Sequence, residues 1–241
     1  MIFILLPAYN EEKNLKKMFK KIEKIHQNKL DITVVLVDDC SKDNTKLLAK
    51  NKYKFKLIYV IHKKNKGLSI TMETGFNHIL KRAKKKDIIV TLDSDNTHPI
   101  SIIPGMIKKI NNGNDIVIAS RFVDKSKING LTFWRHLLSL GAKYLFKIFY
   151  SYKNLNDYTC NFRAYKFKFI KELLKNKSFF KNEDFNIAAK IILFLTNKYK
   201  NLNLLEVPFT LSYDYKIGKS KMKLAKTIGL TFRLIFLRKY K

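Results

Sequence analysis

The sequence predicts an α/β fold in which helices cover both faces of a doubly wound, mostly parallel sheet. Short apolar runs alternate with amphipathic segments through the first half of the chain, which is the order expected of such a sheet. The apolar runs are nearly continuous, as is typical of strands that are buried on both faces. Ligands of these sheets bind at the carboxyl ends of the strands.

The individual elements follow from the spacing of the apolar residues. Apolar positions three or four residues apart predict helices, and short apolar runs between polar turns predict strands. The predicted strands are residues 2–6, 31–37, 57–61, 87–92 and 115–119. The predicted helices between them are residues 11–25, 45–51, 68–82 and 100–110.

The composition indicates one folded domain with a small appendage. A chain of 241 residues is long enough for a full core. The two cysteines, Cys40 and Cys160, are too few for a disulfide framework and fit a reducing cytosol. Residues 1–6 are apolar without a basic leader, so they predict a strand rather than a signal peptide. No apolar run reaches the roughly 18 residues of a spanning helix, which predicts that the chain does not cross a membrane by itself.

The net charge of +30 raises the question of nucleic acid as a partner. Lysine supplies nearly all of this charge, and only six arginines are present. A dedicated reader of bases would use more arginine for bidentate contacts, and no nucleic-acid motif is found. Nucleic-acid binding is therefore a remote alternative. The positive field predicts attraction to anionic surfaces, including lipid headgroups.

Polar loops follow four of the predicted strands, at residues 7–12, 38–45, 93–95 and 120–122, and the first three of them carry acidic residues. Capped turns would explain each loop singly, but not the gathering of acids at one edge of a strongly basic protein. Asp93 and Asp95 come just past the apolar run 88–90. Their carboxylates can converge on one hard cation, Mg²⁺ or Mn²⁺, that bridges to a diphosphate.

Two further helices are predicted at residues 133–150 and 222–240. Apolar and aromatic residues surround most of each segment and are interrupted by basic residues. This pattern is typical of helices that lie in a membrane interface. A pair of ordinary packing helices is the alternative.

These motifs together resemble glycosyltransferase family 2, whose members have the GT-A fold, and within it the polyprenyl-phosphate (dolichol-phosphate) mannosyltransferases. The matching stretches are 6–11 (LPAYNE), 37–41 (VDDCS), 65–68 (NKGL), 93–99 (DSDNTHP), 115–122 (DIVIASRF), 160–165 (CNFRAY), 207–209 (VPF) and 218–221 (GKSK). The resemblance implies a GT-A domain over residues 1–220, with a membrane-interface helix near 131–152. Residues 221–241 would form a C-terminal amphipathic segment that associates with the membrane.

The resemblance also implies roles for the matching residues. Those implied to hold the nucleotide sugar are Pro7, Tyr9, Glu11, Val37, Asp39, Ser94, Asp95 and Lys221. Those implied to bind Mg²⁺ or Mn²⁺ are Asp93, Asp95 and Thr97. The catalytic set would be Asp93, Asp95 and Arg121, and the acceptor phosphate would be held by Arg121, Arg135 and Ser139.

The implied reaction is an inverting, metal-dependent transfer of mannose from GDP-mannose to a polyprenyl phosphate. The protein would lie peripherally on the cytoplasmic face of the membrane, by itself or with a separate membrane-anchoring subunit. Another nucleotide sugar such as UDP-glucose, or a saccharide hydroxyl as acceptor, remains the alternative. Glu183 and Asp184 fall where family members with hydroxyl acceptors carry a catalytic base, and a helix N-cap explains them equally well.

The chain departs from the family pattern at two places near the donor. Tyr215 occupies a position where the subgroup often has arginine, so Lys216 or Lys219 would have to contact the diphosphate instead. Glu73 falls where a basic residue is common. The first departure concerns the closing loop's contact with the diphosphate, and the second leaves the identity of the donor sugar open.

Overall fold

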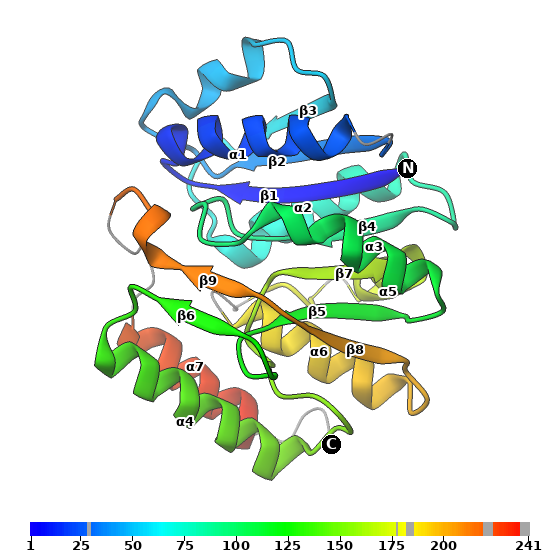
Figure 1. The fold of residues 1–241 in the computed structure, drawn as a ribbon, viewed down its shortest axis with the longest axis vertical. Coiled ribbons are helices and arrows are strands. Elements are labelled where there is room, and N and C mark those ends of the chain that lie inside the picture. Colours follow the sequence, from blue (N-terminus) through cyan, green and yellow to red (C-terminus); the bar gives the residue numbers. More distant parts are fainter. Residues whose placement is uncertain (28–29, 177, 182–185, 219–223, 237–241) are drawn as a thin grey trace.

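The structure, a computed structural model, describes residues 1–27, 30–176, 178–181, 186–218 and 224–236. Its centre is a seven-stranded sheet with the strand order β3-β2-β1-β4-β7-β5-β8 (Figure 1). The strands of this sheet are β1 (Ile2–Ala8), β2 (Ile32–Asp38), β3 (Lys56–Ile61), β4 (Ile88–Thr91), β5 (Ile116–Ser120), β7 (Arg163–Lys166) and β8 (Leu204–Pro208). All pair in parallel except β7, which runs antiparallel between β4 and β5.

A second, two-stranded sheet lies beside the first. It pairs β6 (Lys127–Asn129) with β9 (Thr210–Ser212) in parallel. Because β9 follows β8 directly, this small sheet extends the carboxyl end of β8 toward the loop after β4. The backbone N–H of Ser212 donates to the carbonyl of Thr97 at 3.2 Å.

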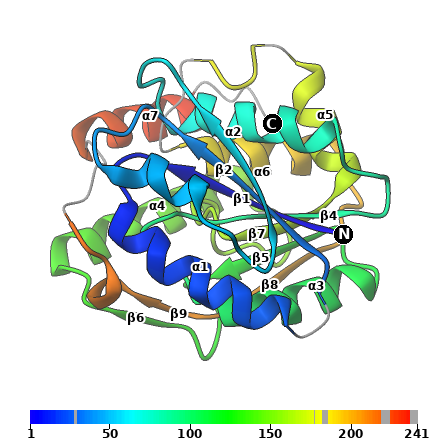
Figure 2. The same cartoon turned by 90° about the horizontal axis from the view of Figure 1, so that it is seen from above.

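Helices cover both faces of the main sheet (Figure 2). One face packs against α1 (Glu12–His26), η1 (Asn44–Lys50), η2 (Ile100–Ile102) and α3 (Ile103–Asn111). The other packs against α2 (Leu68–Leu80), α5 (Phe167–Lys175) and α6 (Ile187–Lys198). The predicted α/β class is therefore confirmed. The helix expected at 45–51 is a 3₁₀-helix, η1, which short helical pieces often adopt.

The central strand β1 shows why its apolar run is continuous. Ile4 and Leu6 pack toward α1, whereas Phe3 and Leu5 pack toward α2. Both sides of the strand are thus buried, as parallel sheets require. Gly75 of α2 allows close packing here, because a Cβ on it would lie 2.1 Å from a Leu5 methyl.

The helices α4 (Phe133–Tyr150) and α7 (Leu224–Phe236) lie side by side below the sheet (Figure 1). The Tyr150 hydroxyl donates to the carbonyl of Leu234 at 2.8 Å, and the rings of Phe149 and Phe236 meet at 5.4 Å. Of the α4 side chains, only Phe146 is fully buried. Within the residues that the structure describes, no helix is both long and apolar enough to span a bilayer.

Candidate active site

The carboxyl ends of the parallel strands bring the four polar loops to one edge of the sheet. Ala8 at the end of β1 pairs with Asp38 of β2, and Leu5 pairs with Thr91 at the end of β4. The loop after β5 leaves from the same edge, because β7 ties β5 to β4. This arrangement is the one predicted from the sequence, and it places the expected ligands together.

The loop after β4 is held in a tight turn around Asp95. Its Oδ1 accepts hydrogen bonds from the Thr97 backbone N–H at 3.2 Å and the Thr97 hydroxyl at 2.7 Å. Asn96 between them adopts a left-handed conformation with φ 63°, which asparagine tolerates better than most residues. The Ser94 hydroxyl donates to the carbonyl of Pro7 at 2.7 Å and so ties this loop to β1.

The two aspartates of the loop have different electrostatic surroundings. Burial raises the pKa of the Asp93 carboxyl, and repulsion from the Asp95 carboxylate adds to this effect. Burial also acts to raise the pKa of Asp95, but the Lys216 ammonium outweighs it and the pKa is lowered. The Lys216 Nζ lies 2.6 Å from Asp95 Oδ2. A cation is therefore already part of this site.

Two residues of the site had no predicted role. The Asn161 amide donates through Nδ2 to Asp93 Oδ1 at 3.2 Å, while its own Oδ1 is buried with no hydrogen-bond partner among the described residues. The His98 Nδ1 accepts the Asp93 backbone N–H at 3.4 Å, and its ring packs on Phe162. The sequence signal was their place in the motifs 93–99 and 160–165.

This donor set fits a divalent metal. Asp93 and Asp95 carboxylates, the Thr97 hydroxyl and the orphaned oxygen of Asn161 are hard oxygen ligands of the kind that Mg²⁺ and Mn²⁺ prefer. The described residues contain no cluster of three or more His, Cys, Asp or Glu side chains for a metal. Mg²⁺ usually takes one or two carboxylates and completes its shell with water and substrate phosphates.

Asp39, predicted to contact the nucleotide, organises the neighbouring loop. Its carboxylate accepts the backbone N–H groups of Lys66 and Gly67, both at 2.8 Å. The same carboxylate lies 2.7 Å from His62 Nδ1. Asp39 therefore holds the turn before α2, where Gly67 has φ 84°. Its contact with a nucleotide stays a prediction.

The other predicted nucleotide residues line the ends of β1 and β2. Val37 is fully buried within β2, so its contribution to a site would come from the backbone. Glu11 is buried, and its Oε2 accepts from Asn14 Nδ2 at 2.6 Å. Tyr9 is half-buried at the same edge. Lys221 lies outside the described residues, as do Glu183 and Asp184.

Arg121, which follows β5, forms a buried ion pair with Asp157. Its Nε and Nη2 donate to the two Asp157 oxygens at 2.8 and 2.7 Å, and Nη2 also donates to the Thr159 hydroxyl at 2.5 Å. Burial acts to lower the pKa of Arg121, but Asp157 outweighs it and raises the pKa. Among the described residues no hydrogen bond uses Nη1, so that nitrogen remains available to a phosphate.

The other two predicted phosphate residues lie on α4. Arg135 and Ser139 are four residues apart, one turn of the helix, and so face the same way. The Ser139 Oγ is buried and has no hydrogen-bond partner among the described residues. The contact of Ser139 with a phosphate stays a prediction. The structure gives no contact between these two residues and Arg121.

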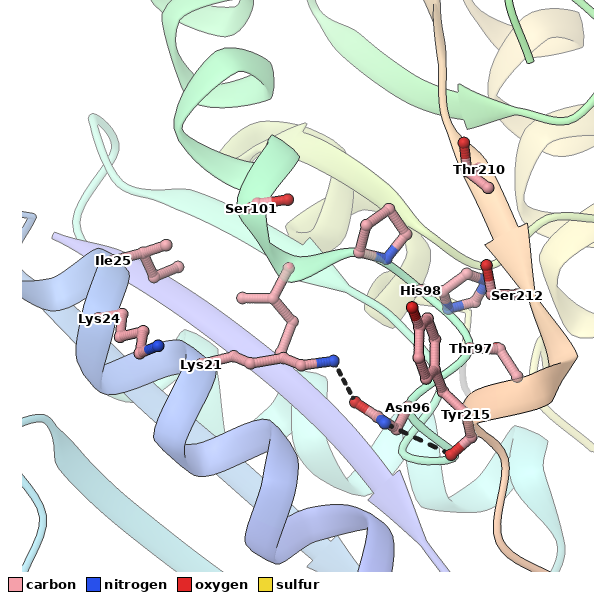
Figure 3. Close-up of a pocket in the computed structure, with 12 residues that line it drawn as sticks. Lys21, Lys24, Ile25, Asn96, Thr97, His98, Ser101, Thr210, Ser212 and Tyr215 are labelled. Carbon is pink, nitrogen blue, oxygen red and sulfur yellow. Dashed lines mark hydrogen bonds between the residues drawn. The ribbon is translucent and has the colours of Figure 1, made fainter. Parts of the chain in front are cut away.

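A pocket of about 420 Å³ lies behind the loop after β4, between α1 and β9 (Figure 3). Its lining residues are Lys21, Lys24, Ile25, Asn96, Thr97, His98, Pro99, Ile100, Ser101, Thr210, Ser212 and Tyr215. Lys21 Nζ donates to Asn96 Oδ1 at 2.8 Å, and Asn96 Nδ2 donates to the Tyr215 carbonyl at 3.5 Å. These bonds link Asn96 to α1 and to Tyr215, whereas the turn itself is closed by the bonds from Thr97 to Asp95.

A mostly parallel sheet with an Asp-x-Asp loop at its carboxyl edge defines the class of GT-A transferases. Solved structures show the same fold. Glucosyl-3-phosphoglycerate synthase from Mycobacterium tuberculosis, in complex with Mn²⁺, UDP and glucosyl-3-phosphoglycerate, superposes with a TM-score of 0.65 over 98% of this chain and 77% of that chain. The sequence identity is 15%, so this likeness concerns the fold alone.

The chain belongs to glycosyl transferase family 2, because residues 3–174 match that family. It is 33% identical over 239 residues to the dolichol-phosphate mannosyltransferase of Pyrococcus furiosus, covering 98% of this chain. The chain spans 62% of the length of that relative. It is 28% identical over 240 residues to the UDP-N-acetylglucosamine–dolichyl-phosphate N-acetylglucosaminyltransferase of Methanococcus voltae, covering 91% of this chain and 89% of that protein.

Proposed function

We propose that this chain transfers mannose from GDP-mannose to a polyprenyl phosphate. The observation that supports this most is the similarity to a dolichol-phosphate mannosyltransferase along almost the whole chain. The acidic loop at the carboxyl edge of the sheet agrees with it, since it offers the oxygen ligands that a metal-bound diphosphate needs.

In this proposal the donor lies across the ends of β1, β2 and β4. Asp93 and Asp95 would hold Mg²⁺ or Mn²⁺, with Thr97 as a further oxygen ligand. The ion supplies neutralisation of the charge that develops on the leaving nucleoside diphosphate. Pro7, Ser94 and Asp39 fix the loops that surround the donor. When the acceptor phosphate oxygen attacks the anomeric carbon from the side opposite the diphosphate, the bond to the diphosphate breaks and the configuration at that carbon is inverted.

The acceptor side needs cations rather than a base. A phosphate oxygen is already anionic near neutral pH, so it attacks without losing a proton to the protein. The free Nη1 of Arg121, the Arg135 guanidinium and the unpartnered Ser139 hydroxyl would hold that phosphate. Guanidinium groups suit phosphate because of their planar arrangement of donors.

The protein would meet its lipid substrate at the cytoplasmic face of the membrane, peripherally or with a separate anchoring subunit. The exposed aromatic face of α4 supports this proposal. Phe133, Trp134 and Ile148 are each more than 70% exposed. Aromatic side chains on a basic amphipathic helix favour the interface between lipid and water.

The direct test is a donor screen with purified protein and a short polyprenyl phosphate. GDP-mannose, UDP-glucose and UDP-N-acetylglucosamine are each supplied with Mn²⁺, with Mg²⁺ or with excess EDTA. We expect mannosyl transfer that EDTA abolishes. Transfer from UDP-N-acetylglucosamine alone would favour the second candidate, an N-acetylglucosaminyltransferase like the Methanococcus voltae relative, and transfer from UDP-glucose alone would indicate a glucosyltransferase. Full activity in EDTA would contradict the metal role.

A second experiment separates a phosphate acceptor from a sugar acceptor. The substitution Arg135→Ala should raise the apparent KM for polyprenyl phosphate about tenfold or more, with little change in the KM for the donor. The substitution Asp184→Asn should keep a substantial fraction of turnover, since no base is needed. An inactive Asp184→Asn variant that still binds donor, together with a normal Arg135→Ala variant, would indicate a hydroxyl acceptor instead.

A further inference from the structure

The loop of residues 93–99 after β4, called the metal loop below, is contacted by a residue from a distant part of the chain, Lys216. Lys216 follows η3 (Tyr213–Tyr215), and 121 residues separate it from Asp95. Its Nζ lies 2.6 Å from Asp95 Oδ2, and the two side chains are 17% and 14% exposed. The pair thus joins the predicted metal ligand to an ammonium that is largely shielded from water.

The backbone around Lys216 is fixed on both sides. The Ile217 backbone N–H donates to Asn14 Oδ1 at 3.1 Å, and Asn14 Nδ2 donates back to the Ile217 carbonyl at 3.0 Å. On the other side, the Tyr215 carbonyl accepts from Asn96 Nδ2 at 3.5 Å (Figure 3). These hydrogen bonds hold the backbone of Tyr215 and Ile217 between α1 and the loop after β4, while the Lys216 side chain keeps its flexible four-carbon stem.

We propose that Lys216 is an internal counter-ion of Asp95, and that the divalent ion displaces it onto the diphosphate of the nucleotide sugar. This inference rests on the proposed function for the identity of the diphosphate. An ammonium and a divalent ion on the same carboxylate oxygen would lie within about 5 Å of each other. In a largely buried site such a pair repels strongly, so binding of the divalent ion excludes the ammonium from Oδ2.

We assign the displaced ammonium to the diphosphate; Asp93 and Glu11 are the other acidic groups near Lys216, and neither would need a cation more than the diphosphate does. A diphosphate bound to a metal at Asp95 would lie within reach of the Lys216 side chain. A lysine suits this exchange, because its compact charge sits on a flexible four-carbon stem and can change partners. Lys216 would thereby supply the cation that the family often takes from an arginine at the position of Tyr215.

Lys21 provides a matched control. Its ammonium also touches the metal loop, at 2.8 Å from Asn96 Oδ1, but its partner is a neutral amide and not a metal ligand. Lys21→Met removes the same charge from the same loop as Lys216→Met. Any difference between the two variants therefore reports on the contact with Asp95 and not on the loss of one positive charge.

The first measurement is titration calorimetry with Mn²⁺ alone, in the absence of nucleotide. Lys216→Met should bind Mn²⁺ about tenfold more tightly than the native protein, because no internal cation has to be displaced. Lys216→Arg should stay near the native affinity, and Lys21→Met should change it less than twofold. An unchanged or weaker Mn²⁺ affinity in Lys216→Met would overturn the proposal.

The second measurement is GDP binding at saturating Mn²⁺. Here Lys216→Met should bind GDP about tenfold more weakly, since the diphosphate loses its cation, while Lys21→Met should bind normally. Native protein that binds GDP equally well in Mn²⁺ and in EDTA would overturn the exchange and make Lys216 a replacement for the metal. Opposite shifts in Mn²⁺ and GDP affinity without mannosyl transfer would contradict the proposed function and leave the exchange standing.

Discussion

Asp157 is a single residue that holds Arg121, one of the residues proposed to bind the acceptor phosphate. Its fully buried carboxylate accepts hydrogen bonds from the guanidinium and the backbone N–H of Arg121. It also accepts one from the backbone N–H of Cys160 at 3.0 Å. Asp157→Asn would leave the Arg121 charge without its partner. Breaking a buried pair in this way costs about 3 kcal/mol or more. We expect that loss in the free energy of unfolding measured with urea, whereas the exposed Asp124→Asn should lose almost nothing.

The free energy of unfolding that Asp157→Asn loses should depend on pH. Burial acts to raise the pKa of Asp157, but Arg121 and the backbone donors outweigh it, so the folded-state pKa is lowered. A lowered folded pKa gives stability that is present above the unfolded pKa of about 3.9 and is lost as the pH falls through the folded value. The difference between native protein and Asp157→Asn should be constant above about pH 5 and shrink below about pH 4. A difference that grows in acid would contradict this assignment.

At the scale of elements, α4 and α7 present an apolar surface that the fold leaves uncovered. The exposed residues of this surface are Phe133, Trp134, Leu137, Leu138, Tyr144, Ile148, Phe232 and Phe236. We expect the protein to sediment with anionic liposomes and to be released only in part by high salt, because the apolar face adds to the attraction between charges.

A substitution on this surface tests which element makes the contact. Phe133→Ser with Trp134→Ser should leave binding in low salt but allow high salt to release the protein. Ile61→Ser with Leu47→Ser removes exposed apolar residues outside α4 and α7 and serves as the control. Complete release of the native protein by moderate salt would mean that charge alone explains binding.

Some strands could be predicted from the sequence pattern and others could not. The parallel strands of the first half were predictable, because an uninterrupted apolar run needs no knowledge of its neighbours. Strand β7 was not, because it begins with Arg163, whose charge would normally exclude a central strand. Its buried guanidinium donates to the carbonyls of Ala188 at 2.6 Å and Tyr158 at 2.8 Å. These tertiary contacts allow a charged residue in a central strand, and the sequence pattern does not reveal them. The strands β6 and β9, with three residues each, are too short to show a period.

At the scale of the whole molecule, two buried acids of the site take their cationic partners from distant parts of the chain. Asp95 pairs with Lys216 and Asp157 with Arg121, although 121 and 36 residues separate the partners in sequence. The sequence predicted Asp95, since it follows a strand that could be recognised, but it did not predict Asp157, which follows no predicted strand. It could not predict which cation each acid contacts, because the folded chain alone sets these distances.

The antiparallel strand β7 has a consequence for how such a protein can vary. The chain leaves the carboxyl edge of the sheet after Ser120 and re-enters it at Arg163, and the Arg121–Asp157 pair fastens the base of this excursion. Everything between, including α4, is therefore a cassette with both ends at one edge. Its part beyond β6, which pairs with β9, can lengthen, shorten or be exchanged without shifting the register of the seven-stranded sheet. Evolution can thus change the proposed acceptor side of the molecule while the strand ends that carry Asp39, Asp93 and Asp95 keep their geometry.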